Sequence, residues 1–253
     1  MRSRTSLLAS AFILVLANLP ATASHAASAT VRDGGNVQLA GTTFRLDGIE
    51  APAFDQMCID EHADAFSCGA AARDQLTKLI GDKQVRCDDL GVDPSYKKRR
   101  LGVCTVEGEA TSLNQLMVRS GLALADARGK FKSDETAAHN DKRGLWKGCF
   151  VTSVDFRRWK KDAALNGAAC RADRDQQIRA VLFADDPAMP AGCNIKGKYA
   201  VRARVTGNTG IYHLQTCRSY PGLDQDRWFC SEDDALAAGF RKAYNCRRSL
   251  PAK

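Results

Sequence analysis

The chain has 253 residues, of which 44% are hydrophobic and 26% are charged, which allows one large domain and a small one. Its formal net charge of +8 suits a polyanionic partner, although many ordinary secreted proteins are equally basic. No segment after residue 26 is apolar enough to cross a bilayer, and no internal repeat occurs that would indicate a repeat array.

The N-terminus has the pattern of a secretory signal peptide over residues 1–26. Arg2 and Arg4 precede an apolar run over 7–19, and small residues at 21–26 suit a signal peptidase. An uncleaved membrane anchor is the alternative, but the run is short for a membrane span. We therefore expect an exported chain that begins near Ala27, has no stable membrane insertion and is secreted or periplasmic.

Ten cysteines, an even number, predict disulfides in an exported chain. The sequence does not prove their connectivity, and no Cys-x-x-Cys motif is present to indicate a redox site or an ordinary zinc knuckle. Pairing neighbours joins the first six as Cys58–Cys68, Cys87–Cys104 and Cys149–Cys170.

The segment 27–150 combines short strands with helices. Residues 31–50 alternate as a hairpin with a turn at 40–41, and further strands are expected at 84–87 and 101–106. Three helices are expected: 68–80 ended by Gly81, a short one between Ser112 and Gly121, and one from Ser133 to about Gly144. This pattern predicts a small closed β-barrel with helical cover.

The remainder divides into an extension and a second module. Residues 151–190 form a charged extension, expected to be helical over 151–184, that ends in a Pro-rich linker at 185–192. A compact α+β module then occupies 191–253, with a helix that Ser231 caps.

Several motifs, in their order and spacing, resemble the staphylococcal nuclease family over residues 31–150. They are Phe44-Arg45-Leu46, Gly48-Ile49-Glu50-Ala51-Pro52, Leu101-Gly102-Val103-Cys104, Leu113-Asn114 and Gly144-Leu145-Trp146-Lys147-Gly148. The resemblance implies a mainly β fold, a five-stranded OB-type barrel with helices. It also implies hydrolysis of phosphodiester bonds in nucleic acid with the help of calcium.

Two positions that the resemblance makes essential hold unsuitable residues. The family's Asp-Gly-Asp-Thr is Asp33-Gly34-Gly35-Asn36 here, so Gly35 replaces a calcium ligand. The family's Asp-x-Pro-Glu is Glu50-Ala51-Pro52-Ala53, in which Glu50 and the Ala51 carbonyl can still face a cation but Ala53 cannot act as general base. Since general-base assistance is worth about 10²–10⁴-fold, we expect weak or absent activity and poor calcium binding.

The phosphate-binding side chains of the family are kept. Arg45 matches the first phosphate-clamping arginine and Arg99 the second, and forked guanidinium groups suit a phosphate. Without the resemblance, Arg45 would be interpreted as a surface strand residue and the basic run as a solvated loop. Three neighbours of Arg99 are expected to add attraction for a polyanion: Lys97, Lys98 and Arg100.

Two aspartates near the altered positions have different expected roles. Asp55 is the candidate for a substitute base, because it lies two residues after Ala53. Asp33 is expected to be a turn residue that accepts hydrogen bonds from nearby amides.

The C-terminal module resembles a small segment often found behind such domains, and more faintly the zinc-binding module of DNA-repair alkyltransferases. Four side chains could nominally hold zinc: His213, Cys217, Cys230 and Cys246. In an oxidising compartment the disulfides Cys193–Cys230 and Cys217–Cys246 are the better interpretation.

Two functions from different classes therefore remain open. One is an exported phosphodiesterase acting on nucleic acid, with Arg45, Glu50 and Arg99 at its site. The other is a non-catalytic protein that binds nucleic acid or polysaccharide, because OB barrels bind both, and some similar exported proteins are associated with exopolysaccharide production. A monomer is expected in either case.

Overall fold

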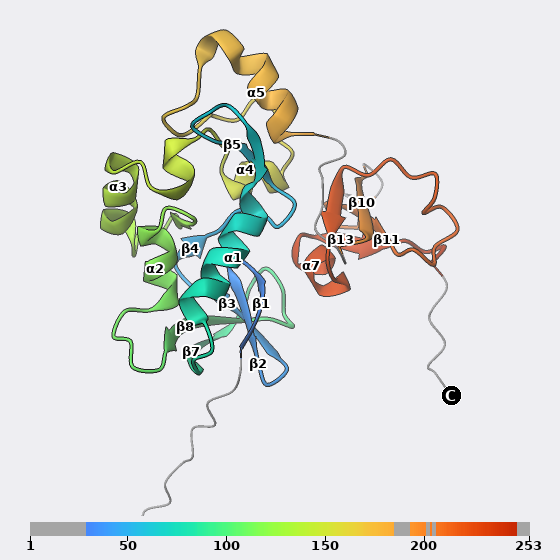
Figure 1. The fold of residues 1–253 in the computed structure, drawn as a ribbon. Helices are drawn as coiled ribbons and strands as arrows, with labels where there is room; N and C mark the ends of the chain where they lie inside the picture. The colour runs from blue at the N-terminus through green and yellow to red at the C-terminus, as the bar shows by residue number, and fades with distance from the viewer. Residues whose placement is uncertain (1–28, 185–192, 201–202, 204–205, 247–253) are drawn as a thin grey trace, which may run out of the picture.

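The computed structural model describes residues 29–184, 193–200, 203 and 206–246 (Figure 1). The expected signal peptide at 1–26 and the expected linker at 185–192 lie outside these described residues. Within the described part of the chain, no helix is both long and apolar enough to span a membrane.

The first domain is built on a five-stranded sheet in the order β1-β2-β3-β8-β7. The first three strands form an antiparallel meander, β3 pairs in parallel with β8, and β8 pairs antiparallel with β7. This is the strand order expected of an OB-type fold. Their bounds are β1 Ala29–Asp33, β2 Asn36–Leu39, β3 Thr42–Leu46, β7 Val85–Val92 and β8 Arg100–Val106.

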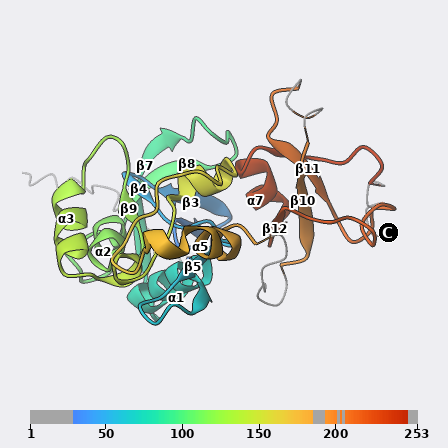
Figure 2. The ribbon, with the colours of Figure 1, turned by 90° about the horizontal axis from the view of Figure 1, so that it is seen from above.

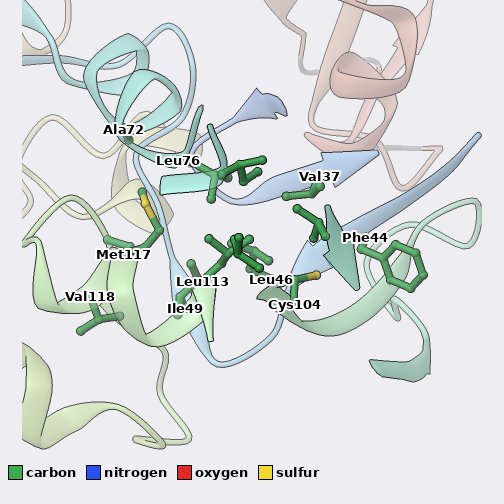
Figure 3. Close-up of a cluster of buried hydrophobic side chains, with 14 of the residues drawn as sticks. Val37, Phe44, Leu46, Ile49, Ala72, Leu76, Cys104, Leu113, Met117 and Val118 are labelled. Atoms are coloured by element: carbon green, nitrogen blue, oxygen red, sulfur yellow. The ribbon is translucent and has the colours of Figure 1, made fainter. Parts of the chain in front are cut away.

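The prediction of a closed barrel was wrong. Strands β1 and β7 are the two edges of the sheet and do not pair with each other. Helix α1 (Cys68–Ile80) packs along β1 instead, so the apolar face of the sheet is covered by a helix and the barrel stays open. The core between sheet and helices includes Val37, Leu46, Leu76 and Met117, none of which is exposed (Figure 3).

The helices of this domain begin and end largely where local signals place them. The Ser67 side chain caps α1 by accepting from the Ala70 amide, and α1 ends at Gly81, whose φ of 55° suits glycine. Ser112 caps α2 (Leu113–Arg119) in the same way. Helix α3 (Lys132–Asn140) begins earlier than expected from Ser133, because the buried Phe131 fixes its first residue in the core.

Two short strand pairs and a 3₁₀ turn complete the domain. Strand β4 (Ile49–Glu50) pairs with β9 (Leu124–Ala125), and β5 (Met57–Ile59) pairs with β6 (Ala65–Ser67). A 3₁₀ turn, η1, covers Gly144–Lys147.

The extension is less helical than predicted for 151–184. It contains α4 (Ser153–Arg157), a 3₁₀ turn η2 (Ala172–Arg174) and α5 (Asp175–Leu182), joined by loops. A single helix cannot form because the disulfide Cys149–Cys170 and the backbone pair Phe150–Asn166 fold the segment back on itself. The extension packs against β5 of the first domain through an apolar cluster, to which Ile59, Phe156, Ile178 and Leu182 contribute.

The C-terminal module is a four-stranded sheet in the order β12-β10-β11-β13, on which helix α7 packs. In both views α7 is the part of the module that lies nearest the strands of the first domain (Figures 1 and 2). Its elements are β10 Ile195–Tyr199, β11 Gly210–His213, β12 Arg227–Phe229, α7 Glu232–Ala237 and β13 Phe240–Lys242.

Five disulfides staple the fold, and no free cysteine remains among the described residues. They join the pairs named from the sequence: Cys58–Cys68, Cys87–Cys104, Cys149–Cys170, Cys193–Cys230 and Cys217–Cys246.

Candidate functional site

A cleft of about 340 Å³ lies where three parts of the chain meet. The first domain contributes the β1–β2 turn, strand β3 and the loop after β4; the extension contributes α4; the C-terminal module contributes β12 and α7. Five arginines border it, one or more from each part: Arg32, Arg45, Arg99, Arg157 and Arg227.

Glu50 is the central carboxylate of this cleft. It ends β4, and its Oε1 accepts a hydrogen bond from Arg45 on β3 at 2.7 Å. Its Oε2 accepts from Arg157 at 2.8 Å and from the Ser153 hydroxyl at 3.3 Å. The side chains of Arg45 and Glu50 are 26% and 20% exposed, so solvent reaches the pair.

Arg99 reaches the same cleft from the loop before β8. Its guanidinium bonds to Asp93 Oδ2 at 2.7 Å and to the Asn36 side-chain oxygen at 3.2 Å. Burial opposes ionisation of Asp93, but hydrogen bonds from Ser95 and the charge of Arg99 outweigh it and lower the pKa of Asp93. The fixed Asp93 carboxylate thus holds Arg99 against the β1–β2 turn.

The two altered positions both border the cleft. Gly35 lies in a turn that Asp33 organises, since Asp33 Oδ1 accepts from the Gly35 amide at 2.7 Å and from the Asn36 amide group at 2.9 Å. The expectation that Asp33 is a turn residue is thereby confirmed. Ala53 offers no side-chain donor or acceptor, and its amide donates to Gln56 Oε1 at 3.1 Å.

Asp55 does not offer a free carboxylate, so the hypothesis of a substitute base at this position finds no support. Its two oxygens accept from the forked guanidinium of Arg227, at 2.7 Å for Oδ1, and Oδ2 also accepts from the Trp228 amide at 3.1 Å. The Asp55 and Arg227 side chains are 2% and 3% exposed. This buried pair joins the C-terminal module to the first domain.

A further carboxylate, Asp234 on α7, also borders the cleft. Burial, followed by the nearby charge of Asp33, raises the pKa of Asp234 to about 6. Its Oδ2 accepts from the Ser231 hydroxyl at 2.6 Å, and Arg32 donates to that same hydroxyl at 2.9 Å.

The structure brings together some of the residues predicted for the site and leaves others apart. Arg45, Glu50, Ala51 and Arg99 border one cleft. Three predicted polyanion-binding residues do not: Lys97 and Lys98 are exposed outside it, and Arg100 is paired with Asp89.

Sequence reasoning missed the charged cleft residues outside the first domain: Arg157, Arg227 and Asp234. The sequence of the extension predicted only a charged, helical segment. Nothing in the spacing of Arg157 or Arg227 indicates that either lies beside the loop after β4.

The donor set in the C-terminal module does not fit zinc. His213, Cys217 and Cys246 lie with their ligand atoms within 4.8 Å of one another, but the two sulfurs are joined to each other. Cys230 is joined to Cys193. Since a cysteine binds zinc as a thiolate, the two disulfides leave only His213 of this set, and burial lowers the pKa of its imidazole.

Comparison with known proteins gives a family for the first domain. Residues 43–148 match the family model described as staphylococcal nuclease homologue. The chain is also similar to the succinoglycan biosynthesis protein ExoI of Rhizobium meliloti (strain 1021), with 27% identity over 123 residues. This alignment covers 47% of the chain and 63% of the relative, so the chain spans less than two thirds of that relative.

Proposed function

We propose that this chain, which carries a staphylococcal nuclease-family domain over residues 43–148, binds a phosphodiester polymer in the cleft and has lost efficient hydrolysis. The single observation that carries the proposal is the convergence of Arg45 and Arg99 on one cleft whose general-base position is Ala53. Guanidinium forks can hold a phosphodiester, whereas an alanine cannot activate water.

The nucleic-acid form of this proposal is favoured by the two kept arginines. Both belong to the matched domain, and the resemblance assigns both to phosphate. Each guanidinium carries five N–H donors. The bonds from Arg45 to Glu50 and from Arg99 to Asp93, Asn36 and Ser95 use only some of them, which leaves donors for a ligand.

Weak or absent hydrolysis follows from the same residues. The general base contributes about 10²–10⁴-fold in nucleases and similar enzymes, and no carboxylate takes its place at 53. Asp55, the nearest one in sequence, is committed to Arg227. Neither residue 53 nor Asp55 can therefore serve as the general base that efficient cleavage needs.

The site of action proposed is outside the cytoplasm, secreted or periplasmic. Five disulfides in one chain are typical of an oxidising compartment, and residues 1–26 have the pattern of a secretory signal.

A second candidate is a role in exopolysaccharide production, with an acidic polysaccharide in the cleft. The observation that favours it is the similarity to a protein named for succinoglycan biosynthesis. Carboxylates of a polysaccharide and phosphates of a nucleic acid both suit arginine forks, so binding assays with both polymers separate the two candidates.

The deciding experiment is cleavage and binding of single-stranded DNA by the purified mature protein, with calcium and with a chelator. We expect binding without cleavage. A Gly35→Asp/Ala53→Glu variant runs beside it, and the first change fits because a Cβ at Gly35 would meet Ala51 Cβ at 3.5 Å and Asp33 Oδ1 at 3.7 Å, ordinary contacts. Efficient calcium-dependent cleavage by the natural protein would refute the loss of hydrolysis. No binding of DNA would refute the proposed ligand.

A further inference from the structure

The cation position of the cleft is already contacted by a positive charge of the chain itself. Glu50 is the one carboxylate that the resemblance leaves for a calcium ion, and both of its oxygens accept hydrogen bonds from protein donors. Two of these donors, Ser153 and Arg157, come from α4, which lies outside the matched segment 43–148. A cation that approached Glu50 would have to displace the Arg157 guanidinium.

The residues present do not fit calcium. Calcium takes six to eight oxygen ligands, with carboxylates prominent among them. Gly35 has no side chain, and the neighbouring Asp33 carboxylate is turned onto its own loop by the Gly35 and Asn36 donors. Glu50 bonds Arg45 and Arg157 instead.

We propose that Arg157 replaces the divalent cation and completes, with Arg45 and Arg99, a metal-independent site for one phosphodiester group. The proposal rests on the proposed function and specifies how that cleft binds its ligand. Arg157 supplies the positive charge that the lost metal would supply, together with directed N–H donors that match phosphate oxygens. Its side chain is 34% exposed, so a ligand in the cleft can reach it.

Helix α4 holds Arg157 in place from both of its ends. Thr152 caps its start by accepting from the Asp155 amide at 3.1 Å, and Phe156 is buried in the cluster of the extension. At its end, the Arg157 carbonyl accepts from the Tyr199 hydroxyl of the C-terminal module at 3.1 Å. With the helix fixed in this way and the guanidinium bonded to Glu50 Oε2, Arg157 is in position before a ligand arrives, which lowers the entropic cost of binding.

Arg158 provides a matched control for Arg157. It is the next residue, it is exposed, it is absent from the cleft lining and its removal changes the net charge equally. The variants Arg157→Gln and Arg158→Gln therefore differ in site geometry and not in overall electrostatics.

The first measurement is the anisotropy of a fluorescein-labelled oligothymidylate titrated with the full mature chain. We expect the same Kd, within about twofold, in calcium and in EDTA, because the site needs no metal. Arg157→Gln should weaken binding by about tenfold or more, the size of one lost charge-assisted hydrogen bond, and Arg158→Gln by about twofold or less. Equal losses in the two variants, or loss of binding in EDTA, would overturn the proposal.

The second measurement does not depend on the polymer. Calcium binding is followed by calorimetry in Gly35→Asp and in Gly35→Asp/Arg157→Gln, with unfolding curves to confirm that both are folded. We expect heat of calcium binding only when Arg157 is removed, because the positive charge that competes with the cation for Glu50 is then gone. Equal heats of calcium binding in the two variants would overturn the role of Arg157. If instead the calcium result holds but the natural protein does not bind oligothymidylate, the proposed function is refuted and the role of Arg157 is not.

Discussion

Two arginine–carboxylate contacts lie at the ends of one short loop, and they differ chiefly in burial. Glu50 and Arg157 are 20% and 34% exposed, whereas Asp55 and Arg227 are 2% and 3% exposed. An exposed pair contributes little to stability, and its partners can be exchanged for a ligand. A buried pair is costly to break, because each charge is left without solvent or counter-charge. One loop therefore carries both the Glu50–Arg157 contact that we assign to ligand binding and the Asp55–Arg227 contact that holds the C-terminal module on the first domain.

The buried pair also positions the exposed one. The Arg227 guanidinium lies over the ring of Phe156, 4.8 Å from its centroid, and over Phe229 at 5.3 Å. Since Phe156 precedes Arg157 in α4, the C-terminal module fixes the helix that presents Arg157 to Glu50. The module thus shapes the cleft through contacts outside it as well as through the residues that border it.

The largest effect is expected from breaking the buried pair. Arg227→Met leaves Asp55 buried without a counter-charge and should lower the free energy of unfolding by about 3–5 kcal/mol, measured by urea denaturation. Arg119→Met is the control, because Arg119 is 45% exposed in its pair with Asp134 and should cost about 1 kcal/mol or less.

A double variant tests the reason given for that effect. Asp55→Asn/Arg227→Met removes both charges and should recover part of the stability that Arg227→Met loses. If the double variant is no more stable than Arg227→Met, the loss comes from packing against Phe156 and Phe229, and an uncompensated charge is not its cause.

The next largest effect is expected at Asp234, a carboxylate of the cleft that accepts a hydrogen bond from the Ser231 hydroxyl. The pKa of Asp234 is raised to about 6, so between about pH 4 and about pH 6 the folded chain keeps a proton that the unfolded chain has released. The contribution of Asp234 to the free energy of unfolding should therefore fall as pH rises through this window. Asp234→Asn cannot titrate and should lack the fall, gaining about 1–3 kcal/mol relative to the natural chain by pH 7. Parallel urea-unfolding profiles against pH would contradict this assignment.

Local signals in the sequence predicted much of the first domain. The start of α1 at Cys68, its end at Gly81 and the Ser112 cap of α2 were predicted from the sequence. The alternation of Val37, Leu39, Phe44 and Leu46 gave β2 and β3. Such features depend on residues a few positions apart, which one sequence displays directly.

The walls of the cleft could not be predicted in this way, because they depend on distant contacts. Arg157 is 107 residues from Glu50 and Arg227 is 172 residues from Asp55. Neither separation produces a spacing pattern in a single chain. Asp55 was therefore interpreted from its short distance to Ala53, when its burial under the C-terminal module decides its role.

The smallest stability effect is expected at Arg157, where the effect on binding is expected to be large. Arg157→Gln should lower the free energy of unfolding by about 1 kcal/mol or less, because the pair with Glu50 is partly exposed and the amide can still donate to the carboxylate. Urea denaturation beside the oligothymidylate titration measures both quantities on the same protein. Substitution of a residue in a ligand site weakens binding with little loss of stability, whereas substitution of a structural contact such as Arg227 chiefly lowers stability. If Arg157→Gln unfolds as readily as Arg227→Met, both contacts are structural, and their difference in burial does not distinguish a binding role from a structural one.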